Sequence, residues 1–168
     1  DGDIVPDETF LPLEGYKGSQ PVRLGNNAQS QQQLSMYGDM LETAFLFVNA
    51  GHVLDLATSR LLAQLANECA DFWRQDDSGI WELHERRHYT HSKIACWITL
   101  DIAICLADEG HIENTWRGRW EREKARISEW VETHCWSPTK QAYTFYAGTD
   151  RLDAALGLVW YYGLKVNP

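Results

Sequence analysis

After residue 26, apolar residues recur along most of the chain at the 3.6-residue period of an α-helix. The spacing predicts helices over residues 27–48, 53–74, 90–108, 113–134 and 150–162. Segment 136–149 lies between the last two helices and is expected to be a loop with a short strand at 143–146. Residues 1–26 contain three prolines and are expected to be irregular, with short extended pieces.

The predicted helices alternate between two hydrophobic patterns. The first helix has one apolar stripe at Leu34, Tyr37, Leu41, Ala44 and Val48 and a second at Met36, Met40 and Phe47. A helix with two apolar sides is expected to be buried on both. The helix over 90–108 has the same pattern, whereas the helix over 113–134 has one apolar stripe and a charged remainder. Inner and outer helices therefore repeat about every 60 residues, which is typical of stacked helical hairpins.

Such hairpins can close into a ring, an α/α barrel in which each inner helix is buried. We therefore expect an all-α fold. The chain supplies about two and a half hairpins, whereas a ring of six hairpins needs twelve helices. We expect residues 1–168 to form a single segment of a larger barrel. Its apolar edges would promote self-association or pack against the remainder of the barrel.

Composition excludes several classes of partner. The chain has 168 residues, 44% of them hydrophobic, which suits one globular domain with a sizeable core. A net charge of −9 argues against binding to nucleic acid or to an anionic membrane surface. No run approaches the length of a membrane span, and no secretory signal is visible. The chain begins with Asp rather than Met, which we interpret as processing, trimming or excision.

The spacing of cysteines and histidines indicates neither a metal nor a cofactor. The four cysteines are far apart and form no CxxC pair, so we expect buried free thiols in a reducing compartment, the cytoplasm. The six histidines show no HExxH spacing, and there is no glycine-rich phosphate loop. The eight tryptophans either fill the core or line a site that stacks against flat ligands such as sugars.

The segment LEGYKGSQPVRLGN, residues 13–26, is the first candidate for ligand binding. Its glycines permit tight turns, which explains the composition without any function. Loops on a rigid scaffold often carry binding residues, however, and Tyr16, Arg23 and Asn26 would suit a polar ligand. Spacing alone favours the structural explanation.

The segment DDSGIWEL, residues 76–83, contains three carboxylates. Asp76 and Asp77 are expected to form a solvated turn that ends a helix. Glu82 has apolar neighbours, and such an environment favours the protonated carboxyl that a general acid needs. The alternative is a glutamate on a strand that points to water, and spacing alone favours that alternative.

The segment RRHYTHSK, residues 86–93, leads into the N-terminus of an inner helix. Its polar and aromatic side chains, His88 among them, either face a sugar or form a helix cap with a solvated basic patch. Within this helix, Asp101 is either a buried structural carboxylate paired with Arg or Lys or a site residue, and the structural role is expected. Lys93 is not clearly its partner.

Five segments in order resemble glycoside hydrolase family 15, which contains glucoamylase-like and bacterial trehalase-like enzymes. They are LEGYKGSQPVRLGNNAQSQ, YGDMLET, SGIWELHERRHYTHSKIACW, TLDIAICLA and YTFYAGTDRLDAALGL. The resemblance covers almost the whole chain. It implies an (α/α)6 toroid of the six-hairpin glycosidase type, in agreement with the hairpin period.

The resemblance also implies a reaction, hydrolysis of an α-glucosidic bond with inversion. Glu82, directly after the Trp of the GIWE-like motif, would be the general acid. A second carboxylate about 6.5–9.5 Å away would activate water on the opposite face of the sugar. Trp81 would line the sugar site beside the acid. His88, from the polar segment before the inner helix, is a further candidate for binding the substrate. Tyr16, Arg23 and Asn26 would lie in the loop that approaches an α-linked glucose oligosaccharide or trehalose.

Two departures from the family pattern leave alternatives open. His84 and Ile102 stand where many relatives carry arginine, so subsite contacts or the partner of Asp101 could differ. No plausible base is found in 83–168; the family's base comes from a later hairpin, so we expect this chain alone to be inactive.

Glucoamylase-like hydrolysis is the main interpretation. The alternatives are a trehalase of the same family and a non-catalytic sugar-binding or regulatory barrel; sugar epimerisation, which relies on paired histidines, ranks below them.

Overall fold

The computed structural model describes residues 8–25 and 31–160, and the chain divides into two compact units, residues 1–32 and 33–168. In the first unit, β1 (Thr9–Leu11) pairs antiparallel with β2 (Val22–Leu24), with Phe10 opposite Arg23. A short 3₁₀ helix, η1 (Tyr16–Gly18), lies in the connection between them. The extended pieces expected in this region are confirmed.

The second unit is helical. It contains α1 (Ser35–Asn49), α2 (Leu56–Phe72), α3 (Thr90–Asp108) and α4 (Arg117–Cys135), followed by a strand pair and the 3₁₀ helix η2 (Ala154–Trp160). The strand pair is β3 (Trp136–Ser137) with β4 (Ala142–Tyr143), so the strand expected at 143–146 begins one residue earlier and is shorter. Four of the five predicted helices are confirmed as α-helices.

Four of the five predicted helix starts are early: α2 and α4 begin three and four residues later than predicted, and the first and fifth helices differ in other ways as well. The first helix begins at Ser35 rather than residue 27, and residues 31–33 are not helical. The backbone amide of Leu34 instead donates to the carboxylate of Asp77, 3.0 Å away, which anchors the chain just before the helix. The fifth helix is a 3₁₀ helix that begins at Ala154, not an α-helix from residue 150. The segment before it belongs to a loop, in which Arg151 accepts a hydrogen bond from the amide of Phe145.

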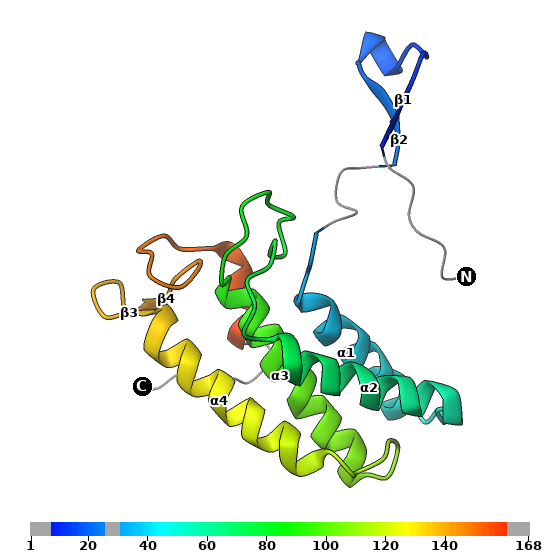
Figure 1. Cartoon of the computed structure of the whole chain (residues 1–168), viewed down its shortest axis with the longest axis vertical. Coiled ribbons are helices and arrows are strands. Elements are labelled where there is room, and N and C mark those ends of the chain that lie inside the picture. Colours follow the sequence, from blue (N-terminus) through cyan, green and yellow to red (C-terminus); the bar gives the residue numbers. More distant parts are fainter. Residues whose placement is uncertain (1–7, 26–30, 161–168) are drawn as a thin grey trace. The chain divides into compact units, whose positions relative to one another are not determined.

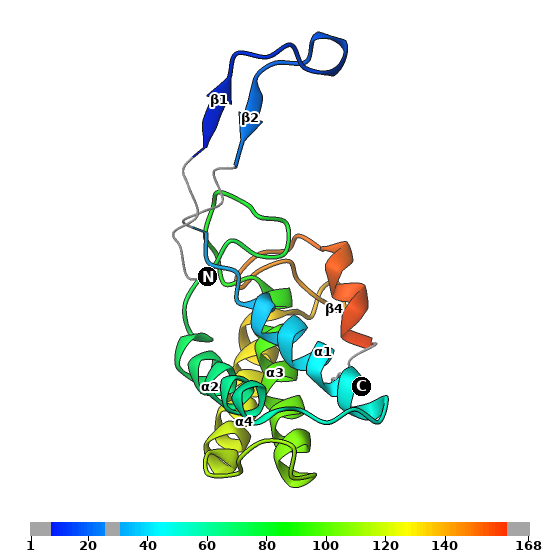
Figure 2. The same ribbon diagram turned by 90° about the vertical axis from the view of Figure 1, so that its right-hand side faces the viewer.

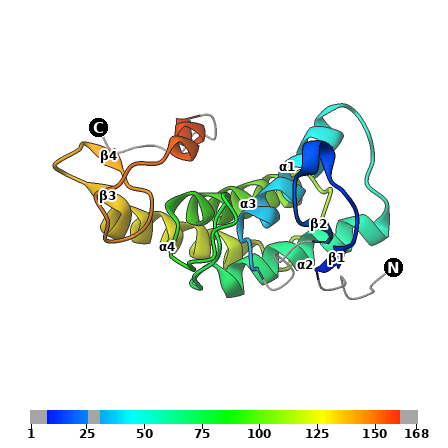
Figure 3. The ribbon, with the colours of Figure 1, turned by 90° about the horizontal axis from the view of Figure 1, so that it is seen from above.

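Helix α3 is the centre of the helical unit, and α1, α2, α4 and η2 all pack against it. Figures 1 and 2 show the successive helices running antiparallel, and Figure 3 shows α3 between α4 and α1. Most of its residues are buried on both faces, as predicted. This helix is long and apolar enough to cross a membrane by composition, with a mean hydropathy of 1.2, but 72% of that stretch is buried inside the unit. Its apolar character is therefore that of a core helix.

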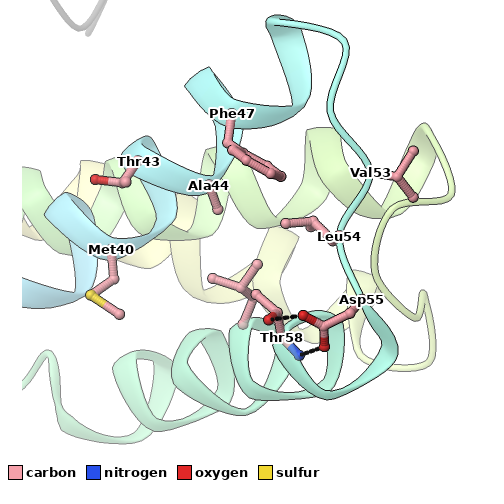
Figure 4. Close-up of a pocket in the computed structure, with 9 residues that line it drawn as sticks. Met40, Thr43, Ala44, Phe47, Val53, Leu54, Asp55 and Thr58 are labelled. Atoms are coloured by element: carbon pink, nitrogen blue, oxygen red, sulfur yellow. Dashed lines mark hydrogen bonds between the residues drawn. The ribbon is translucent and has the colours of Figure 1, made fainter.

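Helix α1 departs from the prediction of burial on two sides. Leu41, Ala44 and Val48 are buried, whereas Met40 and Phe47 on the second stripe are about half exposed. Together with Leu54 they line an apolar groove of about 320 Å³ between the C-terminal part of α1 and the start of α2 (Figure 4). The second stripe is thus unpaired within the described residues.

Helix α4 has one buried face, as predicted, with Trp120, Ile127 and Val131 fully inside. The pairing expected for Asp101 is also found. Its carboxylate lies 2.7 Å from the ammonium of Lys124 on α4, but both side chains are partly exposed, so the expected burial of Asp101 is wrong. Within the described part of the chain, Cys69, Cys96 and Cys135 are buried free thiols, as predicted, whereas Cys105 is a free thiol that is only partly buried.

Candidate active-site loop

The GIWE segment lies on a loop, residues 78–86, that joins outer helix α2 to inner helix α3. Asp77 and Arg87 pair at the base of this loop, and each donates its backbone amide to the other's carbonyl at 3.0 Å. The neighbouring Arg86 guanidinium donates to the carbonyl of Asp76 at 2.7 Å and pairs with its carboxylate at 3.0 Å. The two ends of the loop are therefore held together.

Two positions within the loop have left-handed backbone conformations. Gly79 has φ +67°, and a β-carbon placed there would come within 2.7 Å of the buried Tyr89 ring. Glu82 has φ +52°, which is uncommon for a residue with a side chain. The amide of Glu82 donates to the carbonyl of Gly79 at 3.1 Å, and that of Leu83 to Ser78 at 2.9 Å. These bonds form a compact turn that presents Glu82.

Trp81 and Glu82 are both exposed at this turn. The sequence suggested that apolar neighbours would desolvate Glu82, but Ile80, Trp81 and Leu83 are 39%, 54% and 37% exposed. The indole N–H of Trp81 donates to both carboxylate oxygens of Asp153, at 3.0 and 3.1 Å. The candidate acid therefore lies on an open surface of the described structure, beside an indole held in place by a carboxylate.

Asp153 was quoted within a family segment but not predicted to belong to the site. It precedes η2, and its Oδ1 also accepts the amide of Ala155 at 3.2 Å. The sequence signal available was an aspartate directly before an apolar helical segment, which is typical of an N-cap. Such a signal identifies the cap but not a partner 72 residues away in the chain.

His91, in the first turn of α3, was also missed. Burial lowers the pKa of its imidazole, while the carboxylates of Asp153 and Asp39 act in the opposite direction. Its Nδ1 is buried and makes no hydrogen bond within the described residues. Helix α1, helix α3 and the loop before η2 therefore bring polar side chains together at the end of the unit that carries the Glu82 loop.

His88, predicted to bind substrate, packs against outer helix α4. Its ring lies 5.5 Å from that of Trp130, and its Nδ1 is buried without a hydrogen bond in the described part of the chain. Burial lowers the pKa of His88, helped by the charge of Lys93. The main-chain carbonyl of His88 accepts the amide of Ala147, which joins the two loops at this end of the unit.

Asp77 is the clearest error of the sequence interpretation. It was expected to face water in a turn, yet it is 0% exposed. Its carboxylate accepts the hydroxyl of Ser92 at 2.8 Å and the amide of Leu34 at 3.0 Å. Burial raises the pKa of Asp77, and these two hydrogen bonds act against the shift. Asp76 is partly exposed, in agreement with the prediction.

The remaining predicted substrate-binding residues belong to the first compact unit, residues 1–32. Tyr16 is 83% exposed, at the start of η1. Arg23 on β2 pairs with Glu8 at 2.7 Å. Asn26 lies outside the described residues. Among residues 8–25 and 31–160, no group of three or more His, Cys, Asp or Glu side chains is arranged to hold a metal ion.

Comparison with known families agrees with this arrangement. A family model described as glycosyl hydrolases family 15 matches residues 6–167. The chain belongs to this family. It is 34% identical over 155 residues to a trehalase of Mycolicibacterium smegmatis, covering 89% of this chain and 22% of the relative. It is 30% identical over 150 residues to a trehalase of Thermoplasma acidophilum, covering 89% of this chain and 26% of the relative. The chain thus spans about a quarter of the length of these relatives.

Solved structures support the fold of this family 15 chain. A glycosidase variant in complex with glucose superposes with a TM-score of 0.70 at 20% identity, over 93% of this chain and 42% of the other. A second glycosidase variant gives 0.69 at 21% identity, over 92% and 42%. The described helices are therefore part of the family's (α/α)6 barrel, as the hairpin period and the resemblance predicted.

Proposed function

We propose that the full-length protein containing these residues is a glycoside hydrolase that cleaves trehalose with inversion, with Glu82 as its general acid. The sequence resemblance named glucoamylase-like hydrolysis as the main interpretation and trehalase as an alternative. The similar trehalases at 30–34% identity favour the alternative. The observation that carries the proposal is the position of Trp81–Glu82 at the exposed turn of a closed loop, within the region that matches the family.

In this mechanism, Glu82 donates its proton to the glycosidic oxygen as the bond to one glucose breaks. Water attacks the opposite face of that sugar, activated by a second carboxylate. We propose that this base comes from a part of the protein outside these 168 residues. Trp81 would pack against the sugar ring beside the acid, because aromatic faces suit the apolar faces of sugars.

The substrate and the stereochemistry can be tested together. The full-length protein is assayed on trehalose, maltose and maltotriose, and the trehalose reaction is followed by proton NMR. Inversion at one glucose of an α,α-linked disaccharide releases one β-glucose, and the leaving glucose keeps its α configuration. We expect turnover of trehalose with equal initial amounts of both anomers. Turnover of the maltooligosaccharides alone would refute the assignment of trehalose.

The role of Glu82 is tested by Glu82→Gln, which keeps the shape of the side chain and removes the acid. We expect turnover to fall by about 10²–10⁴-fold, the usual contribution of a general acid, with little change in sugar binding. Glu85→Gln on the same loop is the matched control and should retain activity. Unchanged turnover in Glu82→Gln would show that another group is the acid.

We further propose a cytoplasmic location, supported by four free cysteines, three of them fully buried. Cell fractionation with an antibody against the protein would test it. Recovery from the culture medium would contradict it.

A further inference from the structure

The buried carboxylate of Asp77 connects three segments that are distant in sequence. It accepts one hydrogen bond from the amide of Leu34, directly before α1, and one from the hydroxyl of Ser92, in the first turn of α3. Asp77 itself lies at the base of the loop that carries Glu82. A single side chain therefore ties the start of this loop to the N-termini of two inner helices.

The backbone of Asp77 fixes the other end of the loop. Its amide and carbonyl both pair with Arg87, at 3.0 Å each, so the loop closes at the residue whose side chain is anchored. Between these ends, the bonds from Glu82 to Gly79 and from Leu83 to Ser78 make one compact turn. A displacement of Asp77 would consequently move the turn, and Glu82 with it.

We propose that Asp77 is a positioning residue, whose two accepted hydrogen bonds hold loop 78–86 so that Glu82 and Trp81 meet the substrate in a fixed place. This inference rests on the proposed function of Glu82. Asp77 touches no reacting atom; it acts through the loop. Reactions in a preorganised site are sensitive to such placement, and a shift of about 1 Å can lower the rate on the order of 100-fold.

The environment of Asp77 supports this role over that of a surface turn residue. A buried carboxylate is unfavourable without hydrogen-bond partners, and Oδ2 of Asp77 accepts two bonds, at 2.8 and 3.0 Å, whereas Oδ1 is buried and has no hydrogen-bond partner in the described residues. Replacing Asp77 by alanine would leave the Leu34 amide and the Ser92 hydroxyl without their acceptor. Replacing it by asparagine would keep an acceptor oxygen in the same place.

The first test measures the loop directly, by hydrogen exchange and mass spectrometry on the full-length protein. We expect Asp77→Ala to raise exchange in peptides covering 78–86 by about tenfold or more, because local opening exposes amides bonded within the turn. Asp77→Asn should stay within about twofold of the wild type. Ser92→Ala, which removes one of the two bonds, should lie between them. Peptides from α4 should not change in any variant.

The second test measures the consequence for catalysis. We expect kcat on trehalose to fall on the order of 100-fold in Asp77→Ala, with KM changed by less than about threefold, and to be largely retained in Asp77→Asn. In a double-mutant cycle, Asp77→Ala should lower kcat no further when Glu82 is already glutamine. A purely structural loss of folded protein would lower both backgrounds equally.

Three outcomes would overturn the inference. One is unchanged exchange in the loop of Asp77→Ala, and another is equal deprotection in the alanine and asparagine variants, which would exclude the accepted hydrogen bonds as the cause. The third is a loosened loop with unchanged kcat. If Asp77→Ala does not fold, Ser92→Ala gives the same three readouts. Failure of the proposed function is separate: it appears as normal turnover in Glu82→Gln, while the exchange result still decides whether Asp77 holds the loop.

Discussion

The contact between Gly79 and Tyr89 makes a sharp prediction about the loop that carries Glu82. Gly79→Ala introduces two separate effects. The left-handed φ of +67° disfavours any residue with a side chain, by about 1–2 kcal/mol. The new methyl group would also lie 2.7 Å from Cδ2 of Tyr89, whereas carbon atoms pack best at about 3.5–4.0 Å. The loop or the ring must therefore move by about 1 Å, and such overpacking costs about 1–3 kcal/mol.

Gly110 supplies the matched control. Its φ is +79°, so alanine there meets the same backbone strain, but nothing lies within 4 Å of a β-carbon at this position. We expect the free energy of unfolding to fall by about 1–2 kcal/mol in Gly110→Ala and about 2–5 kcal/mol in Gly79→Ala. Thermal midpoints of the full-length proteins give the comparison, and kcat on trehalose should fall only in Gly79→Ala. Equal midpoints and equal kcat in the two variants would refute the packing of Gly79 on Tyr89.

Three further predictions concern His91, Lys93 and Asp153, three polar side chains of the helical unit. Burial lowers the pKa of His91, so the folded state binds a proton on this imidazole less tightly than the unfolded chain does. The contribution of neutral His91 to the free energy of unfolding is therefore present above about pH 6.5 and is lost as the pH falls through the lowered pKa. Thermal midpoints should therefore depend less on pH below about 6.5 in His91→Gln than in the wild type, and an unchanged dependence would contradict this. Lys93→Met removes the buried ammonium that donates to the carbonyls of Trp73 and Gln75 and should cost about 2–4 kcal/mol. Lys124→Met, at a partly exposed ion pair, should cost less than about 1 kcal/mol, and urea denaturation that ranks the two variants otherwise would be contrary evidence. Asp153→Ala should raise KM more than it lowers kcat, since it frees the indole of Trp81; steady-state kinetics with unchanged KM would show that this hydrogen bond does not position the indole for binding.

Hydrophobic periodicity was sufficient to predict the four α-helices, but it placed only the start of α3 correctly. The pattern over 90–108 gave the bounds of α3 directly, because that helix is apolar on both faces and ends at a glycine turn. The start of α1 depends on a hydrogen bond between Leu34 and Asp77, 43 residues apart, which no local pattern contains. Likewise, periodicity places Met40 and Phe47 on a second apolar stripe of α1, but it does not show that both side chains are about half exposed in the described structure.

At the candidate site, the sequence predicted the loop and Glu82 as the candidate acid, while the residues that hold them needed the structure. The GIWE motif and its neighbours marked Trp81 and Glu82 through family resemblance. The partner of Trp81 comes from a segment 72 residues later, so it emerges only when the two loops meet in the fold. His88 was predicted from its position near a helix start, but that position did not show that its ring packs on Trp130 of the outer helix.

The two adjacent aspartates show why residue type and spacing were misleading here. Asp76 and Asp77 lie where the chain pairs with Arg86 and Arg87, and in extended backbone consecutive side chains point to opposite sides. If one of the pair faces solvent, its neighbour must face inward. The turn signal in the sequence applies equally to Asp76 and Asp77, whereas the backbone pairing with Arg87 places only Asp77 inside. Asp77 is the inward one, so its hydrogen bonds join the loop to the helices that carry it. The orientation of Glu82 thus depends on which of two identical residues the pairing turns toward the core.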